Sequence, residues 1–250
     1  MPGYILLFVA AFGAGVLNTI AGGGTFLTFP ALVFVGIPPV IANATSAVSV
    51  FPGYLAGAIG FRNELRQFDR KQLMRLILIT FFGGFVGSVL LLVSSNKAFS
   101  VIVPFLLLAA TFAFLFGDRV RAWAAEKRLA LTPEGGAGML LVSVYGGYFN
   151  GGLGIVLLAL FSLWGMSDIH RMNGLKNGLS FALSAVSVVT FAVAGAVEWR
   201  QAAVMMIAST AGGYAGAPLA RALPRYIVRG MIAAIGFGMS GLFFYRILSA

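Results

Sequence analysis

The chain has 250 residues, of which 60% are hydrophobic and only 10% charged, and its formal net charge is +10. A soluble domain carries roughly 25% charged residues, so this composition predicts an integral membrane protein. Most basic residues lie in short connections between apolar runs, which indicates cytoplasmic anchoring rather than a nucleic-acid partner. The absence of cysteine excludes disulfides, thiolate metal ligands and cysteine catalysis.

The apolar runs predict an all-α, polytopic membrane protein built from two halves, each with a glycine-broken hairpin followed by three transmembrane helices. The first half is expected to have helices at about residues 4–18, 25–35, 41–60, 72–93 and 98–116. The second half is expected to have helices at about residues 137–149, 155–164, 171–197, 201–222 and 226–248. No basic segment precedes the first run, so we interpret it as a retained helix and not a signal peptide.

These elements form a single transmembrane domain over residues 1–250, because no polar stretch is long enough for a separate soluble domain. Repeat one covers about residues 1–117, a basic cytoplasmic linker about 118–135, and repeat two about 136–250.

Matching segments in the two halves predict an internal duplication. The sequence SAVSV at residues 46–50 recurs at residues 184–188. Further matches pair Arg62 with Arg200, Asn18 with Asn150, and Asn43 with Asn173. The last of these differs by eight positions from the SAVSV register, so the alignment needs gaps.

The distribution of charge predicts that the two repeats are inserted with opposite orientation. The loop at residues 62–75 has five basic residues and is expected in the cytoplasm, whereas its counterpart at 198–200 has one basic and one acidic residue. The uncharged turn at 36–39 corresponds to a turn that holds Asp168, His170 and Arg171. The bias therefore changes sides between the halves, as in inverted-repeat transporters. It also places the segment 221–229 in the cytoplasm and both termini outside.

Each glycine break is a candidate anion site made of main chain. A short helix begins after each break, so its first N–H groups lack helical partners and carry partial positive charge. The candidate residues are Gly22, Gly23, Gly24 and Thr25 at the first break, and Gly151, Gly152 and Gly154 at the second. Close helix packing through small residues is the alternative, and we favour packing for the glycine clusters at 83–87 and 212–216.

Polar side chains near the breaks are further candidates. Asn43, Asn150, Asn173 and Asn177 are amides near membrane depth, where an unbonded amide is costly. They either contact the substrate or bond backbone carbonyls freed by the breaks, and the sequence favours neither. Thr45 follows Asn43 closely and has a hydroxyl that can donate to an oxyanion.

Lys176 is the one cation expected inside a hydrophobic helix, and it is a candidate anion contact. The alternative is that its side chain reaches the cytoplasmic surface beside Arg171. His170 lies in a turn and is expected at the surface. No acidic residue is expected at mid-membrane, and no metal-ligand cluster or paired His–Ser arrangement is visible. We therefore expect no enzyme activity, metal or cofactor.

Several segments together resemble the sulfite exporter TauE/SafE family, also called the four-toluene-sulfonate uptake permease family. They are AGGG at 21–24, FPAL at 29–32, GIPP at 36–39, ANAT at 42–45, AGAIGFR at 56–62 and NGLKN at 173–177. The resemblance implies a bacterial inner-membrane, multi-pass permease for anions such as sulfite, sulfoacetate or other sulfonates. The second break departs from a clean triple glycine, since Leu153 interrupts it.

The sequence thus predicts an alternating-access anion transporter, which holds its substrate between the two breaks near the midplane. The expected partners are a small sulfur-containing anion and the lipid bilayer, with no nucleic acid and with a homodimer left open. Two other functions remain open at this stage, an anion channel and a non-transporting scaffold subunit. An intramembrane enzyme is a distant third. Export by uniport suits a chain without buried carboxylates, because an anion leaves a negative interior downhill.

Overall fold

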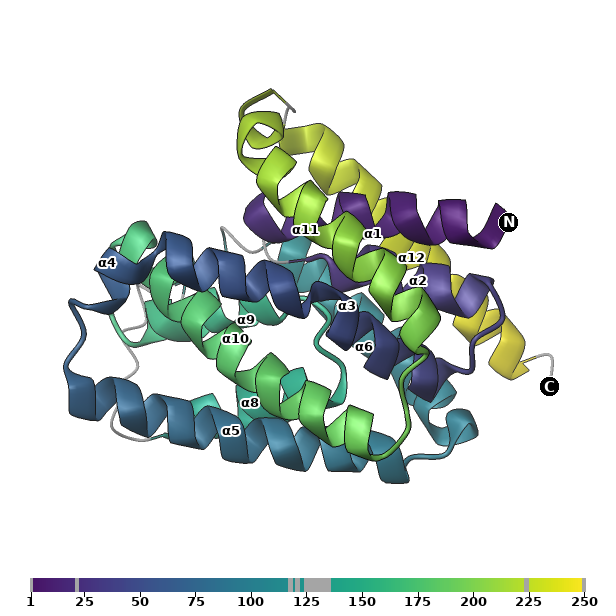
Figure 1. Cartoon of the computed structure of the whole chain (residues 1–250), viewed down its shortest axis with the longest axis horizontal. Coiled ribbons are helices and arrows are strands. Elements are labelled where there is room, and N and C mark those ends of the chain that lie inside the picture. Colours follow the sequence, from purple (N-terminus) through teal and green to yellow (C-terminus); the bar gives the residue numbers. More distant parts are fainter. Residues whose placement is uncertain are drawn as a thin grey trace.

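The computed structural model describes residues 2–20, 23–116, 119, 122–123, 136–222 and 225–248, whose path is shown in Figure 1. All regular secondary structure in these residues is helical, which confirms the predicted all-α class. The first half forms α1 (Pro2–Ile20), α2 (Thr25–Phe34), α3 (Pro39–Gly60), α4 (Arg62–Leu65), α5 (Arg70–Val93) and α6 (Asn96–Leu115). The second half forms α8 (Ala137–Tyr148), α9 (Leu153–Leu163), α10 (Ile169–Val193), α11 (Trp199–Ala222) and α12 (Arg225–Leu248). Most of the predicted linker, 118–135, lies outside the described residues.

Most helices begin and end within two residues of their predicted bounds, because capping residues mark them. The Asp69 carboxylate accepts two backbone N–H groups at the start of α5, and Asp168 does the same at the start of α10. Gly36, Gly165 and Gly195 follow α2, α9 and α10 with φ of 92°, 80° and 66°. After each glycine, the next N–H bonds back to the last helical turn, which closes the helix.

Two predictions about helix bounds are wrong. The helix expected over residues 171–197 ends at Val193, because Gly195 takes a left-handed conformation that stops it. The basic loop at 62–71 contains the short helix α4, which lies on α10. A Cβ atom at Gly174 would lie 3.0 Å from the Glu64 Cβ atom, so a glycine there lets α4 approach α10 closely.

Helices from opposite halves of the chain pack against each other. α1 packs along α11 and α5 along α8, while α3 pairs with α10 and α6 with α12. Glycine makes two of these contacts close: a Cβ atom at Gly15 would lie 2.0 Å from the Ser209 carbonyl oxygen, and one at Gly87 would lie 2.1 Å from the Val144 carbonyl oxygen. The predicted packing role is confirmed for Gly83, Gly84, Gly87 and Gly212. A Cβ atom at Gly213 would meet open space, and the surroundings of Gly216 lie outside the described residues.

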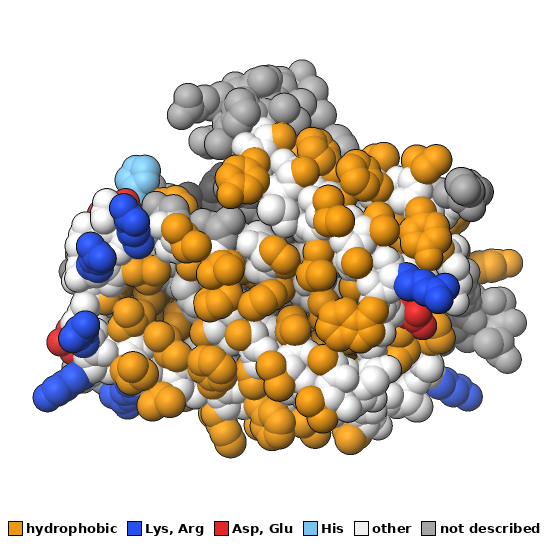
Figure 2. Space-filling model, in the orientation of Figure 1, with side chains coloured by type: hydrophobic (Ala, Val, Ile, Leu, Met, Phe, Trp, Pro, Cys, Tyr) orange, Lys and Arg blue, Asp and Glu red, His pale blue; other side chains and the backbone are white. Residues whose placement is uncertain are grey.

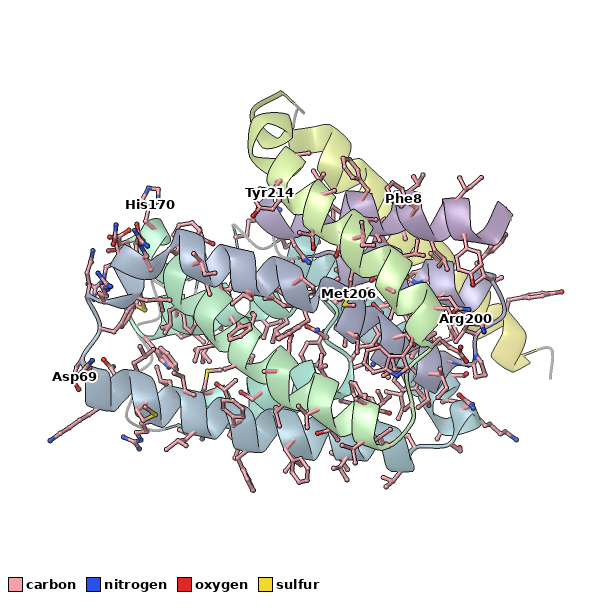
Figure 3. The ribbon with its side chains drawn as sticks, viewed as in Figure 1. Phe8, Asp69, His170, Arg200, Met206 and Tyr214 are labelled. Atoms are coloured by element: carbon pink, nitrogen blue, oxygen red, sulfur yellow. The ribbon has the colours of Figure 1, made fainter. Side chains whose placement is uncertain are left out.

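Charged side chains gather at two ends of the molecule, with apolar side chains between them (Figure 2). Asp69 and His170 lie at one end and Arg200 at the opposite end (Figure 3). We call the first end the basic end, because α4 and the start of α5 lie there (Figure 1) and the sequence around them and beside His170 is basic: Arg62, Arg66, Arg70, Lys71, Arg75 and Arg171. α1 begins and α12 ends at the end that holds Arg200 (Figure 1). Among the described helices, two segments are long and apolar enough to cross a bilayer, Arg70–Val93 and His170–Val193.

Candidate functional site

The first break lies between α1 and α2, where the chain is not helical at Gly23. The Gly24 N–H donates to the Asn18 Oδ1 atom at 2.8 Å, so this amide already has a partner. A Cβ atom at Gly24 would lie 2.7 Å from the Ala14 carbonyl oxygen, so α1 leaves no room for a side chain there. Gly23, Gly24 and Thr25 are buried, and Gly22 lies outside the described residues. Packing therefore explains Gly24, one of the predicted contacts.

The second break lies between α8 and α9 and has a different geometry. Asn150 and Gly152 take left-handed conformations, with φ of 62° and 70°, and Gly152 precedes the first residue of α9. The Tyr145 hydroxyl donates to the carbonyl of Gly151, which is also buried. The Asn43 Nδ2 atom donates to the Tyr148 carbonyl oxygen at 2.8 Å. This bond is the stapling role that the sequence left open for Asn43.

Four phenylalanine rings, which we call the aromatic cluster, lie between the two breaks: Phe26, Phe29, Phe99 and Phe149. The Phe29 and Phe149 ring centroids are 5.9 Å apart, and those of Phe29 and Phe99 are 6.2 Å apart. A Cβ atom at Gly152 would lie 3.7 Å from the Phe26 ring. All four side chains are at most 1% exposed. A substrate between the breaks therefore requires these rings to move.

Of the other polar atoms predicted to contact substrate near the breaks, some have hydrogen-bond partners and some do not. The Thr45 hydroxyl oxygen accepts the Glu198 N–H at 3.0 Å, which holds the segment between α10 and α11 against α3. The Oδ1 atoms of Asn43 and Asn150 are buried and have no hydrogen-bond partner. Buried carbonyl oxygens without partners are uncommon in folded proteins, so these two atoms mark the second break as polar and unsatisfied.

The polar face of α10 is the clearest functional feature. Lys176 is 4% exposed and is the one charged side chain that is buried in the described part of the chain. No described residue forms an ion pair or hydrogen bond with its amine. Asn173 and Asn177 flank it on the same helix and are half-buried. The burial disfavours the alternative in which Lys176 reaches the cytoplasmic surface.

Two serines on α10 were missed by the sequence analysis as site residues. Ser180 and Ser184 follow Lys176 at intervals of four residues, and their hydroxyl oxygens are buried with no hydrogen-bond partner. Their spacing from Lys176 was a signal in the sequence. It passed unnoticed because Ser184 served only as a marker of the duplication.

A cavity of about 350 Å³ opens at the basic end, next to α10. The loop 67–69 and the turn 164–168 line it, together with Arg171 and Leu175. The Arg171 guanidinium lies 5.0 Å from the centre of the Phe68 ring, and its Nε atom is buried without a partner. Leu175 directly precedes Lys176 in α10, but successive residues of a helix point about 100° apart, so the cavity lies on a different side of α10 from Lys176. His170 is exposed, as predicted.

A family model described as "Sulfite exporter TauE/SafE" matches residues 7–243. The chain belongs to this family. The match covers both breaks and the polar face of α10.

Named relatives of this TauE/SafE protein carry transporter names. A "Probable membrane transporter protein" of Haemophilus influenzae is 27% identical over 241 residues, which cover 96% of this chain and 94% of the relative. "Probable membrane transporter protein YfcA" of Escherichia coli K12 is 26% identical over 242 residues, which cover 96% of this chain and 89% of the relative. A comparison with solved structures gives no significant match.

The TauE/SafE membership makes the protein a membrane transporter, and the names indicate transport rather than enzyme catalysis. In such a protein, a buried cation without a counter-ion is a functional feature by default. The arrangement offers one positive charge, two half-buried amides and two unbonded hydroxyls along one buried helix. Those groups can hold an anion, and the positive charge of Lys176 disfavours a cation beside it.

Proposed function

We propose that this protein exports sulfite or organosulfonate-type anions across the bacterial inner membrane by alternating access. The observation that carries the proposal is Lys176, a residue that is only 4% exposed and whose amine has no partner among the described residues. Removing a charge from water costs several kcal/mol unless a partner compensates, and a bound anion would be that partner.

The acidic side chains of the described residues favour an anionic substrate over a cationic one. Glu64 is half-buried, and Asp69, Asp168 and Glu198 are exposed. Two of these carboxylates, Asp69 and Asp168, already bond the first N–H groups of α5 and α10. Within the described chain, therefore, no buried carboxylate neutralises Lys176, and the interior keeps a positive potential.

The packing supports two inverted repeats. Let α1, α2, α3, α5 and α6 correspond, in this order, to α8, α9, α10, α11 and α12. The contact of α1 with α11 is then equivalent to the contact of α8 with α5. Helix starts agree with this correspondence: α2 and α9 begin 128 positions apart, α3 and α10 130, and both α5–α11 and α6–α12 129. This register pairs Asn43 with Asn173 and separates Ser46 from Ser184. The Asn43 match, and not the SAVSV match, is therefore the better guide to equivalent positions.

The charge distribution supports a cytoplasmic basic end, since cytoplasmic loops carry an excess of lysine and arginine. The cavity beside Arg171 would then face the cytoplasm, on the side from which an exported anion arrives. The side chains of the segment 221–229 lie largely outside the described residues, so their predicted side stays a prediction. One negative charge that leaves across 100 mV gains about 2.3 kcal/mol, which is enough to drive export without a coupled ion.

Proteoliposomes test the proposal. Purified protein is reconstituted, the vesicles are loaded with sulfite or sulfoacetate, and efflux is followed under an interior-negative potential. We expect saturable efflux that rises with the potential. Lys176→Gln should abolish most of it, whereas Lys97→Gln, which neutralises an exposed lysine, should leave it unchanged. No efflux of any sulfur oxyanion from wild-type vesicles would reject the proposal, and unitary currents in a planar bilayer would identify a channel instead.

A further inference from the structure

Hydroxyl groups in the described helices have a common way of being satisfied. The Thr80 hydroxyl donates to the carbonyl of Leu76 at 2.7 Å, and the Ser143 hydroxyl donates to Met139 at the same distance. The same bond to the residue four positions earlier is made by Thr28, Ser88, Ser94, Thr111, Ser162, Thr190 and Thr210. It is the usual solution for serine and threonine inside a helix that has no water around it.

Ser180 and Ser184 do not use this solution. Their side chains are 1% and 0% exposed, and their hydroxyl oxygens have no hydrogen-bond partner. The acceptors that this bond would use are present, because α10 is helical at the residues four positions earlier, Lys176 and Ser180. A buried hydroxyl without a bond costs about 1–3 kcal/mol, so two of them in one helix call for an explanation.

The two serines share a face of α10 with Lys176. The three residues are spaced by four, and successive members are about 6 Å apart along the axis and about 40° apart around it. Asn173 and Asn177 fall within the same arc of about 100°. This face is buried, and the opposite face of α10 also packs on protein: Gly174 and Gly178 face α4, and Phe181 stacks on Phe51 of α3.

The stripe has a defined end. Ser187, which follows Ser184 by three residues, accepts a hydrogen bond from the Ser88 hydroxyl at 2.8 Å. That bond ties α10 to α5 and leaves Ser187 with a structural partner. The unbonded hydroxyls are therefore confined to the two helical turns that follow Lys176.

We propose that Ser180 and Ser184 bind the oxyanion group of the substrate. The substrate first contacts Lys176 and then moves along α10 to the two serines. This inference rests on the proposed function. An SO₃ group has three oxygens, so it can accept bonds from the lysine amine and a serine hydroxyl at the same time. Neutral hydroxyls add hydrogen bonds without adding charge, so they hold an anion weakly enough for it to leave. The two hydroxyls are then unbonded in this structure because the substrate is their partner.

The test compares Ser180→Ala and Ser184→Ala with Ser143→Ala, whose hydroxyl bonds its own helix. Sulfite efflux from proteoliposomes gives KM for each variant. We expect KM to rise about ten-fold for each α10 variant, the factor for one charge-assisted hydrogen bond, and to stay at the wild-type value for Ser143→Ala. The melting temperature in detergent should not fall for Ser180→Ala or Ser184→Ala, because each removes an unbonded hydroxyl.

Each result has one meaning. Wild-type KM in both α10 variants, with wild-type protein active, would overturn the inference and leave the proposed function standing. A lower melting temperature with unchanged KM would assign the serines a structural role and would also overturn it. Wild-type protein that moves no sulfur oxyanion would overturn both the inference and the proposed function.

Discussion

The two breaks occupy corresponding places in the two halves, yet they are built differently. At the first, Asn18 lies in α1 and reaches forward to the N–H of Gly24, which is itself in a helical conformation. At the second, Asn150 lies inside the break with φ of 62°, and its Oδ1 atom is left without a partner. Asn18 and Asn150 match in the sequence comparison of the two halves, but they have different structural roles.

The difference also concerns what holds each break in place. The described bond to the Gly24 amide comes from Asn18, within the same broken hairpin. The second break has a bond within its hairpin, from Tyr145 to Gly151, and a further bond from another helix, because Asn43 of α3 donates to the last carbonyl of α8. A movement of α3 relative to α8 would therefore change the second break more directly than the first.

The largest loss of stability is expected from Gly24→Ala. The new Cβ atom would lie 2.6 Å from the Asn18 Nδ2 atom and 2.7 Å from the Ala14 carbonyl oxygen, and the backbone of α1 cannot yield easily. We expect a loss of about 2–3 kcal/mol of stability, measured as a lower melting temperature in detergent. Gly53→Ala is the matched control, since a Cβ atom there meets nothing within 4 Å. If both variants melt alike, close packing does not explain the first break.

The second-largest loss of stability is expected from Asn43→Ala. It removes the donor to the carbonyl of the half-buried Tyr148 and leaves that oxygen without this partner, at a cost of about 1–3 kcal/mol. The melting temperature should fall, and limited proteolysis should detect a looser second break. Asn63→Ala, at an exposed asparagine, should melt like wild type. A stable Asn43→Ala variant that no longer transports would instead favour direct contact between Asn43 and the substrate.

The sequence predicts the helices well because apolar length and capping residues act locally. Gly165 signals the end of α9 and Asp168 the start of α10, and the structure confirms both. The end of α10 was placed four residues too late, because Gly195 lies in a run of small apolar residues that equally suits helix packing. Its left-handed conformation depends on hydrogen bonds across the last turn, which composition does not reveal.

The candidate site was only partly predictable. Lys176 was identifiable because a lone cation in an apolar helix is rare. Ser180 and Ser184 follow Lys176 at a regular spacing, but most helical serines bond their own backbone, so the spacing alone does not identify them, and the coordinates show that these two are unbonded. The aromatic cluster was missed for a related reason: Phe29 and Phe149 are far apart in sequence and meet only through packing.

A smaller effect is expected from Asn18→Ala. The variant removes the acceptor for the Gly24 N–H, in the manner of losing a helix N-cap, which costs about 1 kcal/mol. The melting temperature should fall by less than in Gly24→Ala, and hydrogen exchange should quicken at the start of α2. An unchanged exchange rate there would mean that another acceptor takes over the Gly24 amide.

The smallest effect on stability, and the sharpest test of the comparison, comes from Asn150→Gly. Glycine adopts φ of 62° without strain, and the variant also removes the unpartnered Oδ1 atom. The melting temperature should stay the same or rise by an amount equivalent to at most about 1 kcal/mol. If the Asn150 amide contacts substrate, KM for sulfite should rise in this fully folded variant. Wild-type KM together with a higher melting temperature would show that Asn150 is a strained residue that the transport step does not use.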